Sequence, residues 1–145
     1  MSQKVKISLA LEKNEIGNGP IYAENIWCKV EEGRYKVSNI PMFKENLSLG
    51  DLILVSMENR GTQKLLEIVE KSNNSTVWIY VKDAQLDDWV IKSVTELGCQ
   101  IEGGKPAGNF AVNVPFNVDI NDLINLLSNY IKGEQLILDV PSLRQ

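Results

Sequence analysis

The hydrophobic pattern in the second half of the chain switches between a period of two residues and a period of about 3.6. From Ser75 to Val81 apolar residues alternate as in a strand, and two stretches with helical spacing follow, ending at Gly98 and Gly133. The apolar residues of these stretches are Leu86, Trp89, Val90, Val94 and Leu97, then Leu123, Leu126, Leu127, Tyr130 and Ile131. With further strands expected at 99–102, 110–114 and 136–140, the order is strand, helix, strand, strand, helix, strand. We therefore predict a ferredoxin-like unit over residues 73–145.

The first half has only the strand period. Apolar residues alternate from Val5 to Leu11 and again from Ile26 to Val37, where Glu32-Gly33 predicts a hairpin turn. Two more strands are expected at 52–57 and 64–69, so residues 1–72 predict a small β-barrel or a curled antiparallel sheet. The polar break 72–75 is short, and we expect the two parts of this α+β chain to pack together, as two parts or as one compact domain.

The composition disfavours several classes of catalytic and binding site. The chain has no histidine, which disfavours a Ser-His triad and most zinc sites, and 15 basic against 19 acidic residues give a net charge of −4. This balance disfavours nucleic acid and suits a basic protein partner. Cys28 and Cys99 lie in apolar, alternating segments without a C-x-x-C spacing, which is typical of structural thiols. We expect no cofactor and no metal.

No stretch of the chain is apolar enough for a membrane span, and residues 1–6 lack the apolar core of a signal peptide. We expect a cytoplasmic protein without a membrane partner.

The candidates for catalysis are weak. The glycine-rich loop 103–108 contains Lys105, but it leads into a strand, whereas a phosphate-binding loop opens a helix. Paired carboxylates occur at several turns and helix starts, where they cap and solvate. If the chain were an enzyme, Asp51, Asp87 and Asp88 would be its candidates, and we predict that it is not one.

Exposed aromatic residues are better candidates for binding. Trp78 and Tyr80 superficially match the first strand of RNA-recognition modules, but the expected partner positions Ala111 and Asn113 offer no stacking ring. They either bury against the N-terminal strands or anchor a protein interface. Trp27 points opposite Ile26 and Cys28 and is a further surface candidate. We predict partner-binding residues at Trp27, Trp78, Tyr80, Asp87 and Asp88.

Four segments carry a family resemblance. They are 23–27 (Ala-Glu-Asn-Ile-Trp), 35–43 (Tyr-Lys-Val-Ser-Asn-Ile-Pro-Met-Phe), 49–53 (Leu-Gly-Asp-Leu-Ile) and 75–77 (Ser-Thr-Val). In order and spacing they resemble the bacterial domain-of-unknown-function family 4265. The resemblance implies a bacterial source and an intact full-length domain, and it supplies no catalytic or ligand residues.

The leading functional hypothesis is a non-enzymatic immunity or antitoxin protein, monomeric or weakly dimeric, that binds and neutralises a basic toxin domain. A regulatory small-ligand-binding domain is the first alternative, by analogy with ferredoxin-like units. A carboxylate-dependent enzyme is the second.

Overall fold

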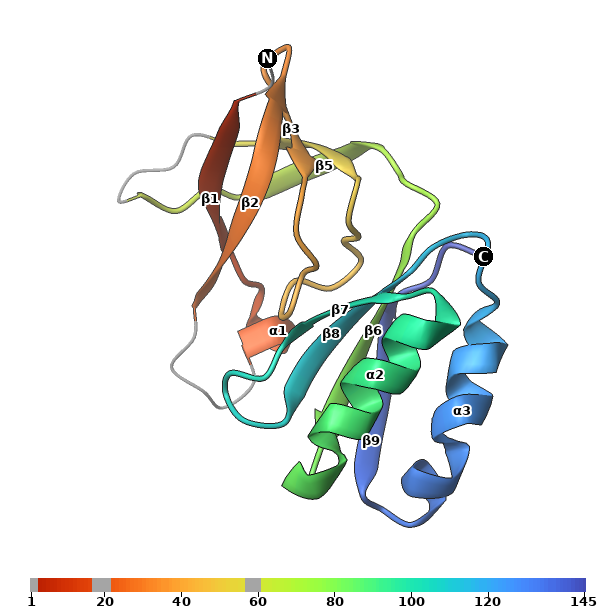
Figure 1. The fold of residues 1–145 in the computed structure, drawn as a ribbon. Coiled ribbons are helices and arrows are strands. Elements are labelled where there is room, and N and C mark those ends of the chain that lie inside the picture. The colour runs from red at the N-terminus through yellow and green to blue at the C-terminus, as the bar shows by residue number, and fades with distance from the viewer. Residues whose placement is uncertain (1–2, 17–21, 57–60) are drawn as a thin grey trace. The chain divides into compact units, whose positions relative to one another are not determined.

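The computed structural model of the chain describes residues 3–16, 22–56 and 61–145. Within these residues the fold is α+β and mostly sheet, with nine strands in two antiparallel sheets and three α-helices. The chain divides into two compact units, Met1–Ser72 and Asn73–Gln145 (Figure 1). Met57, at the end of one predicted strand, lies outside the described residues.

Unit 1 contains the five-stranded sheet, whose strands follow one another in the order β1-β2-β3-β4-β5. The elements are β1 (Lys4–Ala10), α1 (Lys13–Ile16), β2 (Ala23–Glu31), β3 (Arg34–Val37), β4 (Leu52–Val55) and β5 (Leu65–Glu70). The predicted turn between β2 and β3 is present, with positive φ angles at Glu32 and Gly33. An isolated parallel bridge joins Leu9 to Gln63.

The core of unit 1 forms on one face of this sheet. The alternating residues supply it, so that successive strands present one apolar and one polar face. The buried members are Ile7, Leu9, Ile26, Cys28, Val37, Leu47, Ile53 and Val55.

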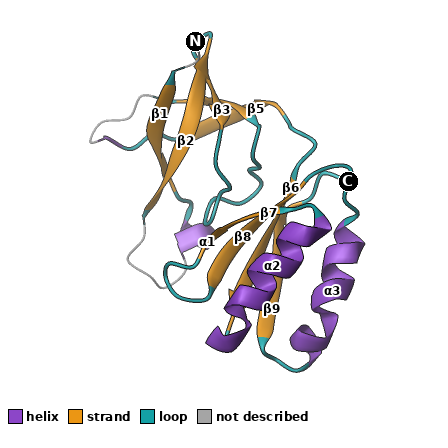
Figure 2. Cartoon of the chain, viewed as in Figure 1, coloured by secondary structure: helices purple, strands orange, loops and turns teal. Residues whose placement is uncertain are grey.

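Unit 2 has the predicted order of elements. They are β6 (Ser75–Val81), a 3₁₀ helix (Ala84–Leu86), α2 (Asp87–Leu97), β7 (Gln100–Gly103), β8 (Asn109–Val114), α3 (Ile120–Lys132) and β9 (Leu136–Ser142). The sheet order is β7-β8-β6-β9, so β6 and β8 are central and β9 is an edge strand (Figure 2).

Both helices of unit 2 begin and end for local reasons. The Asp119 side chain accepts a hydrogen bond from the Asn121 amide at the start of α3, and Gly98 takes the left-handed conformation after α2. Their apolar sides meet the same face of the sheet, in one core that includes Val90, Leu123 and Val112. The rings of Trp89 and Tyr130 join the helices, with centroids 4.7 Å apart. No helix in the described part of the chain has the length and apolar character needed to span a membrane.

Gly108 gives a stability prediction for the junction of β6 and β8. The Val81 amide donates to the Gly108 carbonyl at 2.7 Å, and a Cβ added to Gly108 would lie 2.5 Å from the Val81 carbonyl oxygen. Gly33 has a similar φ, +79° against +84°, with nothing near its would-be Cβ. We expect Gly33→Ala to cost about 1–2 kcal/mol from backbone strain alone, and Gly108→Ala to cost distinctly more.

The free energy of unfolding from denaturant titration checks this difference. Equal losses in the two variants would mean that unit 2 relaxes around the added methyl group.

Candidate protein-binding surface

The carboxylate of Asp51 holds a turn. Asp51 is fully buried, its Oδ2 accepts from the Ser48 amide and its Oδ1 accepts from the Ser72 amide, both at 2.8 Å. The Asp51 carboxylate therefore links two segments, the one that precedes β4 and the one that follows β5. Asp51, a catalytic candidate from the sequence, therefore stabilises the backbone of unit 1.

A second set of buried charges fastens the segment between β3 and β4. The Glu24 carboxylate accepts from the backbone amides of residues 42–44 at 2.6–2.9 Å. Glu15 binds the Lys44 ammonium at 2.9 Å and accepts from the Glu45 amide at 2.7 Å. Burial raises the pKa of Glu24, and the three amides offset part of that rise. These charges stabilise a loop, and the sequence analysis missed them.

The two cysteines are buried and free of disulfides. Burial raises the pKa of the Cys28 thiol to about 12 and that of Cys99 to about 11. Neither side chain is a thiolate at neutral pH, so neither is poised as a nucleophile.

Asp87 and Asp88 occupy the first turn of α2, where negative charge complements the helix dipole. Asp88 is exposed and Asp87 is half-buried, with one carboxylate oxygen, Oδ1, buried and without a hydrogen-bond partner. Across the described ranges no three His, Cys, Asp or Glu side chains gather as metal ligands do. The pair therefore adds charge to the helix side of the sheet.

Trp78 and Tyr80 lie on the opposite face of that sheet, because Val77, Ile79 and Val81 face the helices. Tyr80 is 42% exposed and Trp78 is half-buried. As expected, Ala111 and Asn113 sit across from β6 on this face and offer no aromatic ring: Ala111 pairs with Trp78 and Asn113 with Thr76.

The neighbour of Tyr80 on β9 is Ile137, which is 52% exposed. Asp139 stands opposite Trp78 in the same way. The structure thus joins two of the predicted residues, Trp78 and Tyr80, to an exposed isoleucine. Asp87 and Asp88 belong to the other side of the sheet, and Trp27 belongs to unit 1.

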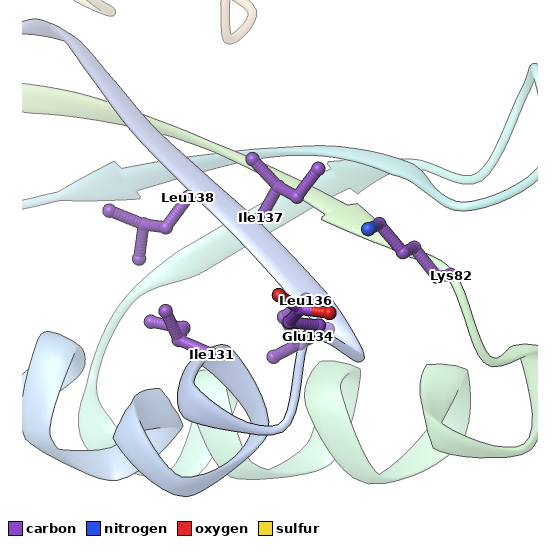
Figure 3. A pocket seen from close by; sticks show the side chains of 6 residues that line it. All are labelled: Lys82, Ile131, Glu134, Leu136, Ile137 and Leu138. Carbon is purple, nitrogen blue, oxygen red and sulfur yellow. The ribbon is translucent and has the colours of Figure 1, made fainter.

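A hollow of about 380 Å³ lies along the first half of β9 (Figure 3). Its lining residues are Lys82, Ile131, Glu134, Leu136, Ile137 and Leu138. Leu136, Leu138 and Ile131 belong to the core on the helix side, whereas Ile137 points to the other face of the strand. The hollow therefore wraps around the edge of β9.

Hydrogen bonding shows which part of that edge is open. The Val81 amide donates toward β8 and the Lys82 amide donates to Gln135, toward β9. The backbone groups of successive residues in a strand point to alternate sides, so Ile137 and Asp139, which stand opposite Tyr80 and Trp78, form their backbone hydrogen bonds with β6. The backbone groups of Leu136 and Leu138 point away from the sheet and meet no further strand; Leu136 is itself buried, and Leu138 is partly exposed.

Beyond Leu138 the edge closes. The Val140 amide is not available to donate to another strand, because it already donates to Oδ1 of the neighbouring Asp139 at 2.9 Å. Pro141 follows and has no amide hydrogen. We define the open edge Leu136–Leu138, the hollow beside it and the exposed side chains of Tyr80 and Ile137 as the β9 surface.

The sequence held one signal for the β9 surface. Leu136-Ile137-Leu138 is a continuous apolar run, and a strand at the edge of a sheet with one covered face would normally alternate. The run indicates that both faces of this strand contact apolar groups, including the face of Ile137 that points away from the helices.

Comparison with known proteins places the chain in a family. Residues 24–137 match the model of a domain of unknown function, DUF4265, and the chain belongs to this family, as the four sequence segments indicated. A crystal structure of a hypothetical protein from Neisseria gonorrhoeae is similar over 100% of this chain and 97% of that one, with a TM-score of 0.78 and 21% identity. That likeness shows a shared fold. No curated protein matches the chain.

Glu24 gives a pH prediction. Its pKa in the folded chain is raised above the ordinary 4.5, so its contribution to stability is complete below about pH 4.5 and is lost as the pH rises through the folded pKa. Relative to the non-titrating Glu24→Gln variant, we expect the wild type to lose stability as the pH rises from about 4.5 toward neutral. Unfolding free energies of both proteins across this range measure the difference.

Glu67→Gln, which removes an exposed carboxylate on β5, is the control for the loss of one solvated charge. A wild type that instead gains stability relative to Glu24→Gln as the pH rises would mean that the three amide hydrogen bonds outweigh desolvation.

Proposed function

We propose that the chain is a cytoplasmic, non-enzymatic protein-binding domain that takes up an extended segment of a partner along the β9 surface. The open edge at Leu136–Leu138 carries the proposal, because an unpaired strand edge beside an apolar hollow is the geometry of strand addition. The partner's backbone would complete the hydrogen bonds and one of its apolar side chains would fill the hollow. Ile137 and Tyr80 would contact the partner's next side chains.

The charge of unit 2 supports a basic partner. Residues 73–145 contain nine acidic and five basic residues, so this unit carries the whole net charge of −4. Glu134 lines the hollow, and Asp139 stands next to the open edge. A basic toxin neutralised by an immunity or antitoxin protein is the partner that we propose. The chain itself acts as a monomer or as a weak homodimer through paired β9 edges.

The proposal includes a finer description of both folds. The order β9-β6-β8-β7 with two helices on one face supports a ferredoxin-like unit. In unit 1 the amide of Ala10 donates to Gln63 and the amide of Gln63 donates to Ser8, both at 2.8 Å, which supports a barrel-like closure of the sheet. A closed sheet would leave the two edge strands of unit 2, β7 and β9, as the edges available for a partner.

The absence of an enzymatic role is also part of the proposal. Asp51 uses both carboxylate oxygens to hold backbone amides, and the two cysteines are protonated at neutral pH. Asp51, the catalytic candidate in unit 1, is thus engaged in hydrogen bonds to the backbone, and neither Cys28 of unit 1 nor Cys99 of unit 2 is a reactive thiolate.

The hollow favours one second candidate function. A volume of about 380 Å³ is within the range of small-molecule sites, and Lys82 with Glu134 could orient a polar ligand. A regulatory ligand would then raise the melting temperature of the chain. The hollow is open along one side, which suits a polypeptide better than a small molecule.

The test is co-purification with the product of the adjacent gene. We expect wild-type protein to form a complex with it and to relieve its toxicity on co-expression. Ile137→Lys places a charge against the docked strand and should weaken the complex at least about tenfold, with the melting temperature unchanged because Ile137 is exposed. Titration calorimetry measures the affinity.

Leu66→Lys is the matched control, since Leu66 is 56% exposed on β5 of unit 1. Equal affinities for the two lysine variants would exclude the β9 surface. A metabolite that raises the melting temperature of wild type but not of Ile137→Lys would assign the hollow to a small ligand instead.

A further inference from the structure

Basic side chains gather on the outer face of the five-stranded sheet in unit 1. Unit 1 is neutral, with ten basic and ten acidic residues, but the two signs are not mixed evenly over it. Lys4 stands directly opposite Lys29, and Lys29 directly opposite Lys36, so that three adjacent strands carry one row of lysines. Lys6 continues the group in the next row. All four side chains are exposed.

This row costs stability. Neighbouring strands are about 4.8 Å apart, so the row places three ammonium-bearing residues within about 10 Å, and like charges directly opposite each other are destabilising. In the part of the chain that the structure describes, none of the four lysines has a carboxylate within 4.0 Å. The nearby acids lie beside other residues: Glu31 stands opposite Arg34, and Glu70 is two strands away from Lys36, opposite Leu52. An anionic ligand would relieve the repulsion.

An exposed aromatic ring lies within the same group. Trp27 pairs with Lys6 across the strands, is 46% exposed, and has the Lys6 ammonium 5.3 Å from its ring centroid. The ring is on the same face as Lys29, two residues further along β2. A flat ring between cations is the arrangement that stacks a base while lysines contact the neighbouring phosphates.

We propose that this lysine and tryptophan face of unit 1, formed by Lys4, Lys6, Lys29, Lys36 and Trp27, binds single-stranded nucleic acid. Trp27 favours this ligand over an acidic protein, because carboxylates would use the lysines and leave the indole without a partner. The expectation of no nucleic acid came from the net charge of the chain, and that charge resides in unit 2. The face is distinct from the β9 surface and independent of it.

The test is fluorescence anisotropy of full-length protein with short labelled oligothymidylate and oligouridylate at about 50 and 200 mM salt. Lys29→Gln/Lys36→Gln should weaken binding at least about tenfold and reduce the slope of log affinity against log salt by about 1.4, for two lost phosphate contacts. Its melting temperature should be equal to or above that of wild type, because the variant relieves repulsion. A merely structural role for the row would lower it.

Two further variants separate stacking from charge. Trp27→Ala should weaken binding about tenfold without changing the salt slope, and Trp27→Phe should restore most of it. Lys92→Gln/Lys132→Gln removes the same charge from exposed positions of unit 2 and should leave binding unchanged. Absence of binding at about 50 mM salt, or equal losses in the two double variants, would overturn the proposal. Competition by polyglutamate but not by oligonucleotide would assign the face to an acidic protein.

Discussion

Both units depend on one constraint, that a buried backbone amide must have a hydrogen-bond acceptor. In the segment between β3 and β4, strand carbonyls accept the amides of Ser38 and Gly50 near its two ends, and the carboxylates of Glu24 and Asp51 accept those of residues 42–44 and Ser48. In unit 2 the four-stranded sheet has two edge strands, β7 and β9, and the backbone groups of Leu136 and Leu138 on β9 point away from the sheet. The β9 edge, one of the places where this sheet has no further strand beside it, is the place proposed to take up another chain.

Charge has two different uses in this fold. The side chains of Glu15, Glu24 and Lys44 are buried in unit 1, where their hydrogen bonds hold a loop and, at Glu24, offset part of the cost of desolvation. Exposed charge is separated by sign, with the acidic excess in unit 2 and a row of lysines on one sheet face of unit 1. The net charge of the whole chain describes neither surface. Each surface has to be judged from the residues that lie next to each other.

Several elements were predictable because their signals are local. The helix ends at Gly98 and Gly133 and the turn at Glu32-Gly33 are all where the sequence placed them. The predicted binding residues fared differently. Trp78 and Tyr80 share a face, but Asp87 and Asp88 lie on the other side of that sheet, and the residue that completes the face, Ile137, was not among the predictions.

The sequence by itself determined the order of the elements, their apolar sides and the family, because side-chain period and capping act over a few neighbouring residues. Only the tertiary structure decided which strand is an edge, which amides Glu24 and Asp51 accept, and which lysines stand opposite each other. Some of these contacts, such as Glu24 with Lys44 and Asp51 with Ser72, join positions 20 and 21 residues apart, and they exist only once the strand order and register are set.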